Sequence, residues 1–318
     1  MSWPSLSQIA DAGIDRRQVL RSSATALAMF GTATPSAGRS NTAPTPTEAV
    51  EDRLAPSTAE LTQQQKLTPD DGDKDEVFGA RVAVSSDGTT ALIGAFNDDS
   101  YGSAAGSAYI FTRTDGTWTQ QQKLVADDGD GDDRFGLSVA LSSDGTTALI
   151  GAFSDENPNG EQAGSAYIFT RTDSTWTQQQ KLVADDGDSE DWFGRSMALS
   201  NDGTTALIGA MGYEGPTGEQ VGSAYVFTHT DGEWGQQKLM ADDGDAEDLF
   251  GGSVALSGNG TTALIGAYND KNSNGEAHGQ FSGAGSAYVF TYTNDEWSQQ
   301  QKLTADDSDS EDWFGYSV

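Results

Sequence analysis

The chain has 318 residues, with 49 aspartates and glutamates against 17 lysines and arginines, which gives a formal net charge of -32 at pH 7. This charge argues against nucleic acids and anionic membranes as partners, because both would repel the protein. The sequence contains no cysteine, which excludes disulfides, thiol catalysis, Cys-ligated zinc and lipidation on cysteine.

The few lysines of the chain are placed unevenly. Five of the seven occupy one position of an internal repeat, namely Lys66, Lys123, Lys181, Lys238 and Lys302. Together with the dominance of aspartate, this usage is typical of a secreted protein of an extreme halophile. At about 1 M salt the screening length falls to roughly 3 Å, so repulsion between surface carboxylates is largely removed.

Residues 1–37 are predicted to be a twin-arginine signal peptide. Arg16 and Arg17 precede an apolar pair, and a mildly apolar stretch rich in small residues follows. This stretch is too short and too polar to span a bilayer, so we expect export and no membrane span. Residues 38–59, in which Pro, Thr and Ala dominate, are predicted to form a flexible linker.

Residues 60–318 carry a repeat that is marked by Phe-Gly pairs beginning at 78, 135, 193, 250 and 314. In the unit that begins at Phe135, the Asp144–Gly145 pair predicts a tight hairpin whose two central residues both have positive φ. No helix pattern occurs in the unit. Four strands joined by short antiparallel connections are predicted over 137–142, 147–152, 165–170 and 176–183.

The composition of the strands predicts their order within a unit. The fourth strand is rich in glutamine and carries Lys181, which is typical of an outer edge. The second strand is the most apolar and contains Gly151, so we expect it near the centre of the assembly, where backbones approach closely. A single unit has too few apolar side chains to offset its ordering entropy, so neighbouring units must cover one another, as the blades of a β-propeller do.

The recurring stretches "FG", "SVALS", "LIGA" and "GSAY.FT" resemble the FG-GAP repeat family, whose repeats form the propeller of integrin α-chains and of microbial surface proteins. The resemblance covers residues 61–318. Calcium-binding members carry a D-x-[DN]-x-[DN]-G loop between the first two strands, whereas this chain has only short turns such as "SSDGT". The chain therefore resembles a short-turn branch, and integrin-type calcium sites are not expected.

The fold class that follows is an all-β propeller of four-stranded antiparallel blades. Four full repeats are preceded by a lone fourth strand and followed by part of a first strand. We therefore expect an incomplete propeller, since a fifth blade shared by the two ends would lack its middle strands.

Acidic loops before each Phe-Gly pair are the strongest local signal for a site. Carboxylates at alternate positions can converge on a hard cation such as calcium, although no Gly and distal Glu complete an EF-hand loop. The alternative is a solvated acidic rim that reflects salt adaptation. The cation hypothesis names two sets, which are Asp128, Asp130 and Asp132, and Asp186, Asp188 and Glu190.

Catalysis is not expected. A catalytic carboxylate pair should be singular, but these acids recur once per unit, and the repeated serines have no histidine nearby in sequence. The two histidines, His229 and His278, fall at a variable polar position and in the longest loop. The tryptophans that open each fourth strand are expected to pack in the blades, whereas Trp192 and Trp313 are candidate exposed platforms for a ligand.

The most variable segments are the loops between second and third strands, and these are the expected contact surface. The resemblance implies an exported, non-enzymatic propeller that binds a protein or glycan at the cell surface or in the medium. An accessory module of a longer secreted hydrolase or polysaccharide-binding protein and a structural cell-surface component are the alternatives. No nucleic acid partner or cofactor is expected apart from the calcium hypothesis, and the sequence does not specify the ligand, the anchoring mode or the oligomeric state.

Overall fold

The computed structural model describes residues 62–216, 219–271, 283–307 and 309–318. The chain divides into two units, Met1–Thr62 and Gln63–Val318, and all described strands belong to the second. The described residues contain strands and turns and no helix. The proposed signal peptide and linker, with Arg16 and Arg17, lie outside the described residues.

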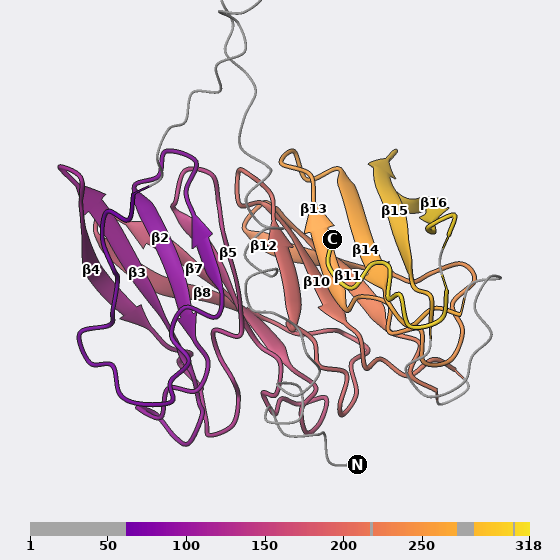
Figure 1. Cartoon of the computed structure of the whole chain (residues 1–318), viewed down its shortest axis with the longest axis horizontal. Coiled ribbons are helices and arrows are strands. Elements are labelled where there is room, and N and C mark those ends of the chain that lie inside the picture. Colours follow the sequence, from indigo (N-terminus) through magenta and orange to yellow (C-terminus); the bar gives the residue numbers. More distant parts are fainter. Residues whose placement is uncertain (1–61, 217–218, 272–282, 308) are drawn as a thin grey trace, which may run out of the picture. The chain divides into compact units, whose positions relative to one another are not determined.

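The strands form four separate sheets, each with four antiparallel strands in chain order, which we call blades 1 to 4 (Figure 1). Blade 1 contains β1 (Val82–Val84), β2 (Thr90–Ala95), β3 (Ser107–Thr114) and β4 (Thr117–Leu124). Blade 2 contains β5 (Ser138–Leu141), β6 (Thr147–Ala152), β7 (Ser165–Thr172) and β8 (Thr175–Leu182). Blade 3 contains β9 (Ser196–Leu199), β10 (Thr205–Ala210), β11 (Ser223–Thr230) and β12 (Glu233–Leu239). Blade 4 contains β13 (Ser253–Leu256), β14 (Thr262–Ala267), β15 (Ser286–Thr293) and β16 (Glu296–Leu303). The predicted propeller-type blades are thereby confirmed.

Consecutive blades contact through their first strands, β1 with β5, β5 with β9 and β9 with β13. The fourth strand is the outer edge, as its glutamines predict. The second strand is the most buried, but the first strand rather than the second lies at the inner edge of each sheet. The apolar second strand therefore occupies the middle of the sheet, and in blades 2 and 3 both of its faces are covered by neighbouring blades.

The core lies between blades, as the interface of blades 1 and 2 illustrates. Leu92 and Ile110 of blade 1 pack with Ile150, Phe169 and other apolar residues of blade 2. The opposite face of blade 1, which points away from blade 2, is less covered. On it, Val82 and Val84 of β1 are 61% and 56% exposed. Among the four described blades, none packs against this face of blade 1.

The Phe-Gly pair joins each blade to the one before it. Phe135 is 1% exposed and meets Tyr167 edge to face at 5.5 Å between ring centroids. Its backbone N–H donates to the Ala105 carbonyl of blade 1 at 2.9 Å. The N–H of Gly136 donates to the Gly151 carbonyl at 2.9 Å, so the same dipeptide also fixes the inner end of its own blade.

The hairpin between first and second strands differs from the predicted form. Gly145 has a φ of 67°, but Asp144 does not adopt positive φ. The Asp144 carboxylate accepts hydrogen bonds from the Ser142 hydroxyl at 2.7 Å and the Thr146 backbone N–H at 3.0 Å. The aspartate thus builds the turn with its side chain, and only the glycine needs the left-handed conformation.

Candidate functional site

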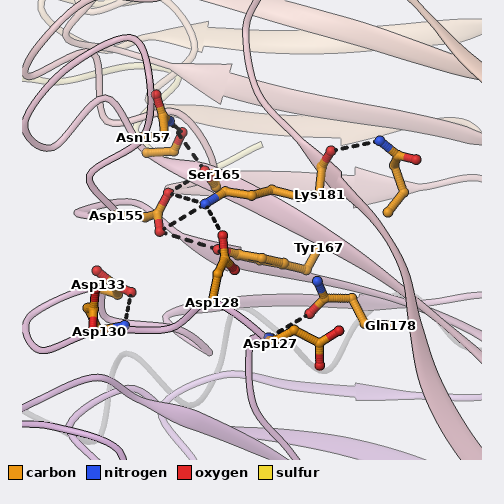
Figure 2. Close-up of polar contacts among 12 residues, drawn as sticks. Asp127, Asp128, Asp130, Asp133, Asp155, Asn157, Ser165, Tyr167, Gln178 and Lys181 are labelled. Atoms are coloured by element: carbon orange, nitrogen blue, oxygen red, sulfur yellow. Dashed lines mark hydrogen bonds and ion pairs between the residues drawn. The ribbon is translucent and has the colours of Figure 1, made fainter.

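Each acidic loop lies at the end of the blades where the second strand connects to the third. Figure 2 shows this region for blade 2, where the ammonium group of Lys181 lies between Asp128 of the acidic loop and Asp155 of the β6–β7 loop. The Nζ–O distances are 2.7 Å to Asp128 and 2.9 Å to Asp155. One lysine on β8 therefore fastens two loops to the blade.

The same cluster recurs in blades 1 and 4. Lys123 pairs with Asp71 at 2.8 Å and with Asp98 at 2.6 Å. Lys302 pairs with Asp243 at 2.8 Å and with Asp270 at 2.6 Å. The recurrence explains why lysine is almost confined to one repeat position, since there it neutralises an acid that burial would otherwise penalise.

Burial and pairing oppose each other in these clusters. At Asp128 burial favours the neutral acid, but the hydrogen bond and charge of Lys181 outweigh it and hold the pKa of the carboxyl below its usual value. Burial also disfavours the charged form of Lys181, yet hydrogen bonds to the two aspartates raise the pKa of the ammonium. Lys181 and Asp128 thus stay ionised at neutral pH.

Blade 3 departs from this pattern. Tyr213 stands where the other blades have the loop aspartate. Lys238 keeps its partner Asp186 at 2.8 Å, and its ammonium lies 2.9 Å from the centre of the Tyr213 ring. A cation–π contact therefore replaces one ion pair, and this cluster contains one carboxylate fewer.

A second carboxylate recurs two residues before each Phe-Gly pair. Asp133, Asp191 and Asp248 are 5%, 1% and 2% exposed. One oxygen of each accepts a backbone N–H three residues earlier, at 2.7, 2.9 and 2.7 Å. Within the described residues, the other oxygen of Asp191 and of Asp248 is buried without a hydrogen-bond partner. Burial therefore raises the pKa of these carboxyls, to about 6 for Asp133 and Asp191 and about 7 for Asp248.

These buried carboxyls predict that the protein is more stable at pH 5 than at pH 8. A folded-state pKa above the unfolded value means that the native state holds the extra proton, so stability falls as pH rises through about 6. Between pH 5 and pH 8 we expect a loss of about 1.4 kcal/mol each for Asp133 and Asp191 and of about 2.6 kcal/mol for Asp248. Urea unfolding in molar KCl at a series of pH values measures this loss. Asp191→Asn should flatten the dependence of the free energy of unfolding on pH. An Asp191→Asn profile as steep as that of the wild type would contradict this assignment.

The structure separates the residues of the cation hypothesis. Asp128 and Asp186 each face a lysine, while Asp130 and Asp188 are exposed and contribute backbone N–H groups to the buried carboxylates. Asp132 and Glu190 have φ values of 71° and 64°. No group of three or more histidine, aspartate or glutamate side chains is placed to hold a metal ion within the described residues. Calcium binding in these loops stays a prediction.

Several important residues were not singled out from the sequence. Asp98, Asp155 and Asp270 bind the recurring lysines, and each lies three residues after the strand ending "LIGA". That constant position within otherwise variable loops is the signal that identifies them. Trp176 and Trp297 are core residues, as predicted, with exposures of 2% and 6%.

The other candidate residues have different surroundings. Trp313 is 42% exposed, whereas Trp192 is half-buried and its indole N–H donates to Gln162 at 3.4 Å. His229 is exposed and lies against Trp234, with ring centroids 5.1 Å apart. His278 lies outside the described residues.

Comparison with solved structures finds distant neighbours. Kuenenia stuttgartiensis hydrazine synthase is 12% identical, with a TM-score of 0.45 over 76% of this chain and 53% of that one. The Pseudomonas aeruginosa periplasmic gluconolactonase PpgL is 15% identical, with a TM-score of 0.45 over 71% of this chain and 57% of that one. The chain thus spans little more than half the length of either structure. No curated protein matches the chain.

In the part of the chain that the structure describes, no helix has the length and apolar character that a membrane crossing requires. The family model of the FG-GAP repeat matches residues 61–111, 118–169, 176–227, 234–290 and 297–318. These segments cover most of the chain. The second, third and fourth segments each run from the fourth strand of one blade into the third strand of the next, and the last covers β16 and the Phe-Gly pair that follows it. The chain therefore belongs to the FG-GAP repeat family.

Proposed function

We propose that the protein is an exported, non-enzymatic propeller that binds a protein or glycan partner through the loops between second and third strands. The observation that carries this proposal is the contrast between blades and loops. The four second strands read "TALIGA" without change, whereas the loops that follow them share little beyond their anchoring positions. Variation that is concentrated in one set of loops on a fixed frame is typical of a binding surface.

The anchoring contacts support this role. Asp98 accepts hydrogen bonds from the Ser107 hydroxyl at 2.8 Å and the Tyr109 hydroxyl at 2.9 Å, in addition to its ion pair with Lys123. Tyr101, three residues further along the same loop, is 62% exposed. The base of the loop is held rigidly while its tip stays accessible, so a ligand would meet a preorganised surface.

Two features favour an extracellular partner. The twin-arginine pattern at Arg16 and Arg17 supports export, and the net charge of -32 suits a protein that works in salt. The acids of the described loops recur from blade to blade and are engaged by lysines, which favours a structural role for them over a catalytic one.

A tagged chain expressed in a halophilic host tests the proposal. We expect the tag in the medium or at the cell surface, together with a co-purifying protein or glycan after crosslinking in molar KCl. A chain with Arg16→Lys and Arg17→Lys should stay in the cytoplasm without that partner. Replacing residues 99–104 by Gly and Ser should release the partner and leave secretion intact. Secretion without any retained partner would instead favour a structural cell-surface role.

A further inference from the structure

The outer strand of blade 3 is one residue shorter than its counterparts. In blades 1, 2 and 4 the register shifts at the third strand, so that one glutamine of the fourth strand is bulged, namely Gln121, Gln179 and Gln300. In blade 3 the pairing of β11 with β12 is continuous, with Phe227 opposite Gln236 and Val226 opposite Gln237. The bulged glutamine is therefore missing from β12.

The missing side chain has a defined role in blade 1. The Gln121 amide donates to the Ser174 carbonyl, in the turn between the third and fourth strands of blade 2. The equivalent turn of blade 4 contains Asp295. β12 has no bulged glutamine to make this bridge to that turn, and in blade 2 the bulged Gln179 donates instead to Thr177 of its own strand. The outer rim between blades 3 and 4 thus lacks a side chain that fills the same space between blades 1 and 2.

A second change at the same junction removes another side chain. Gly235 lies opposite Thr228, whereas the equivalent residues are Thr119, Thr177 and Ser298. A Cβ added at Gly235 would meet only the Thr228 carbonyl oxygen, at 3.9 Å. The space in front of this glycine is therefore open, and the backbone does not require glycine there.

The third change is on blade 4, which faces the outer strand of blade 3 across this junction. Tyr292 of blade 4 stands where the other blades have Arg113, Arg171 and His229. It pairs across the strands with Trp297, which packs in the core between blades 3 and 4, and the two rings lie 5.7 Å apart. The two aromatic residues therefore share the side of the blade that faces blade 3.

Together these changes open a cleft of about 400 Å³ between the outer strands of blades 3 and 4. Its lining includes Thr228, Glu233, Gly235, Tyr292, Asp295 and Trp297. The paired bonds between Gln237 and Trp297 are both 3.4 Å, against 2.8 and 2.9 Å between Gln122 and Trp176 at the first junction. Three departures from a near-identical repeat thus lie together at this cleft.

We propose that this cleft binds a short neutral oligosaccharide. The exposed Tyr292 side chain offers a surface for the C–H face of a pyranose ring, and the carboxylates of Glu233 and Asp295 with the Thr228 hydroxyl match sugar hydroxyls. The volume falls within the range of small-molecule sites. The two carboxylates and the net charge of -32 would repel an anionic sugar. The inference rests on the proposed binding function for its ligand class, but it places a glycan on the rim and not on the variable loops.

Titration of the whole chain with neutral cello-, manno- and chito-oligosaccharides in molar KCl tests this proposal. We expect one series to bind and acidic oligogalacturonate not to bind. Gly235→Thr, which refills the cleft without a clash, and Tyr292→Arg, which restores the residue of blades 1 and 2, should each weaken binding about tenfold. Thr119→Ser and Arg171→Lys change the matching positions at the junction of blades 1 and 2 and should leave affinity unchanged, and melting curves check that all variants fold.

Two results would overturn the cleft assignment. One is that none of the three neutral series binds. The other is sugar binding that survives both Gly235→Thr and Tyr292→Arg. If such binding is lost on replacing residues 99–104, or if only a protein partner is captured, the proposed function stands and the cleft site is wrong.

Discussion

Lys181→Met is expected to lower the free energy of unfolding by about 3–5 kcal/mol, because it leaves an uncompensated charge in the interior. The lysine is the ion-pair partner of both Asp128 and Asp155, and Asp155 is 2% exposed. Methionine preserves the length of the side chain, so the loss reports the charge and its hydrogen bonds more than packing. Urea unfolding in molar KCl measures the change.

Three comparisons make this prediction specific. Lys74 is exposed, so Lys74→Met should change stability by less than about 0.5 kcal/mol. Lys238→Met should cost less than Lys181→Met, because Tyr213 replaces the buried aspartate in blade 3. Adding Asp155→Asn to Lys181→Met should recover part of the loss, because it removes the stranded charge. Equal losses for all three lysines would show that the buried ion pair is not the cause.

Gly151→Ala is expected to destabilise the protein by about 3 kcal/mol or more, because the added methyl group has no space. A Cβ on Gly151 would overlap the backbone carbonyl oxygen of Gly194 and the Ser138 hydroxyl. The Gly194 carbonyl belongs to the next Phe-Gly pair and accepts a hydrogen bond from that same hydroxyl. Since backbone rather than a flexible side chain is in the way, the two blades must separate to accommodate alanine.

The matched control for Gly151→Ala is Gly235→Ala on the outer strand of blade 3. Gly235 is exposed, and a Cβ there approaches nothing closer than the Thr228 oxygen at 3.9 Å. Restricting the unfolded chain should make this variant neutral or more stable by about 0.4–1 kcal/mol. Thermal unfolding of both variants in the same salt gives the comparison. A Gly151→Ala variant as stable as Gly235→Ala would contradict the close packing of blades.

The effects expected for Lys181→Met and Gly151→Ala both concern how the frame of the protein is held together. Blades meet through backbone at their inner edges, where glycine permits contact, and they are tied at one end by lysines that bridge loops from different parts of the chain. Lys181 and Asp128 are far apart in sequence, and their ion pair links β8 to the loop that precedes blade 2. The frame is thus fixed at the centre and beneath the variable loops, which is where a binding surface needs rigidity.

Much of the fold was predictable because it repeats. The strand over residues 147–152 was predicted with the bounds that the structure gives, since "TALIGA" ends at a turn on one side and at a polar loop on the other. The role of Trp176 and the outer position of β8 also followed from local pattern. The form of the Asp144–Gly145 turn did not, because the aspartate side chain competes with the backbone for hydrogen bonds.

The candidate site was less accessible to sequence reasoning. The acidic loops were identified, but the lysine at their centre was interpreted as an edge residue of the fourth strand. Its function depends on Asp155, which reaches it only after β6 and β7 have formed a hairpin. The cleft between blades 3 and 4 was missed for the same reason, since Gly235 and Tyr292 belong to different repeats and meet only across a junction.

The sequence by itself determined the repeat, the strands, the acidic character and the family, because each of these is written in residues close together along the chain. Only the tertiary structure decided which charges are paired, which carboxyls are buried and where a cleft remains between the outer strands of two blades. Those properties depend on distances between units about 57 residues apart in sequence. A local pattern can specify a blade, but the electrostatics and the open space between blades arise only when neighbouring blades pack.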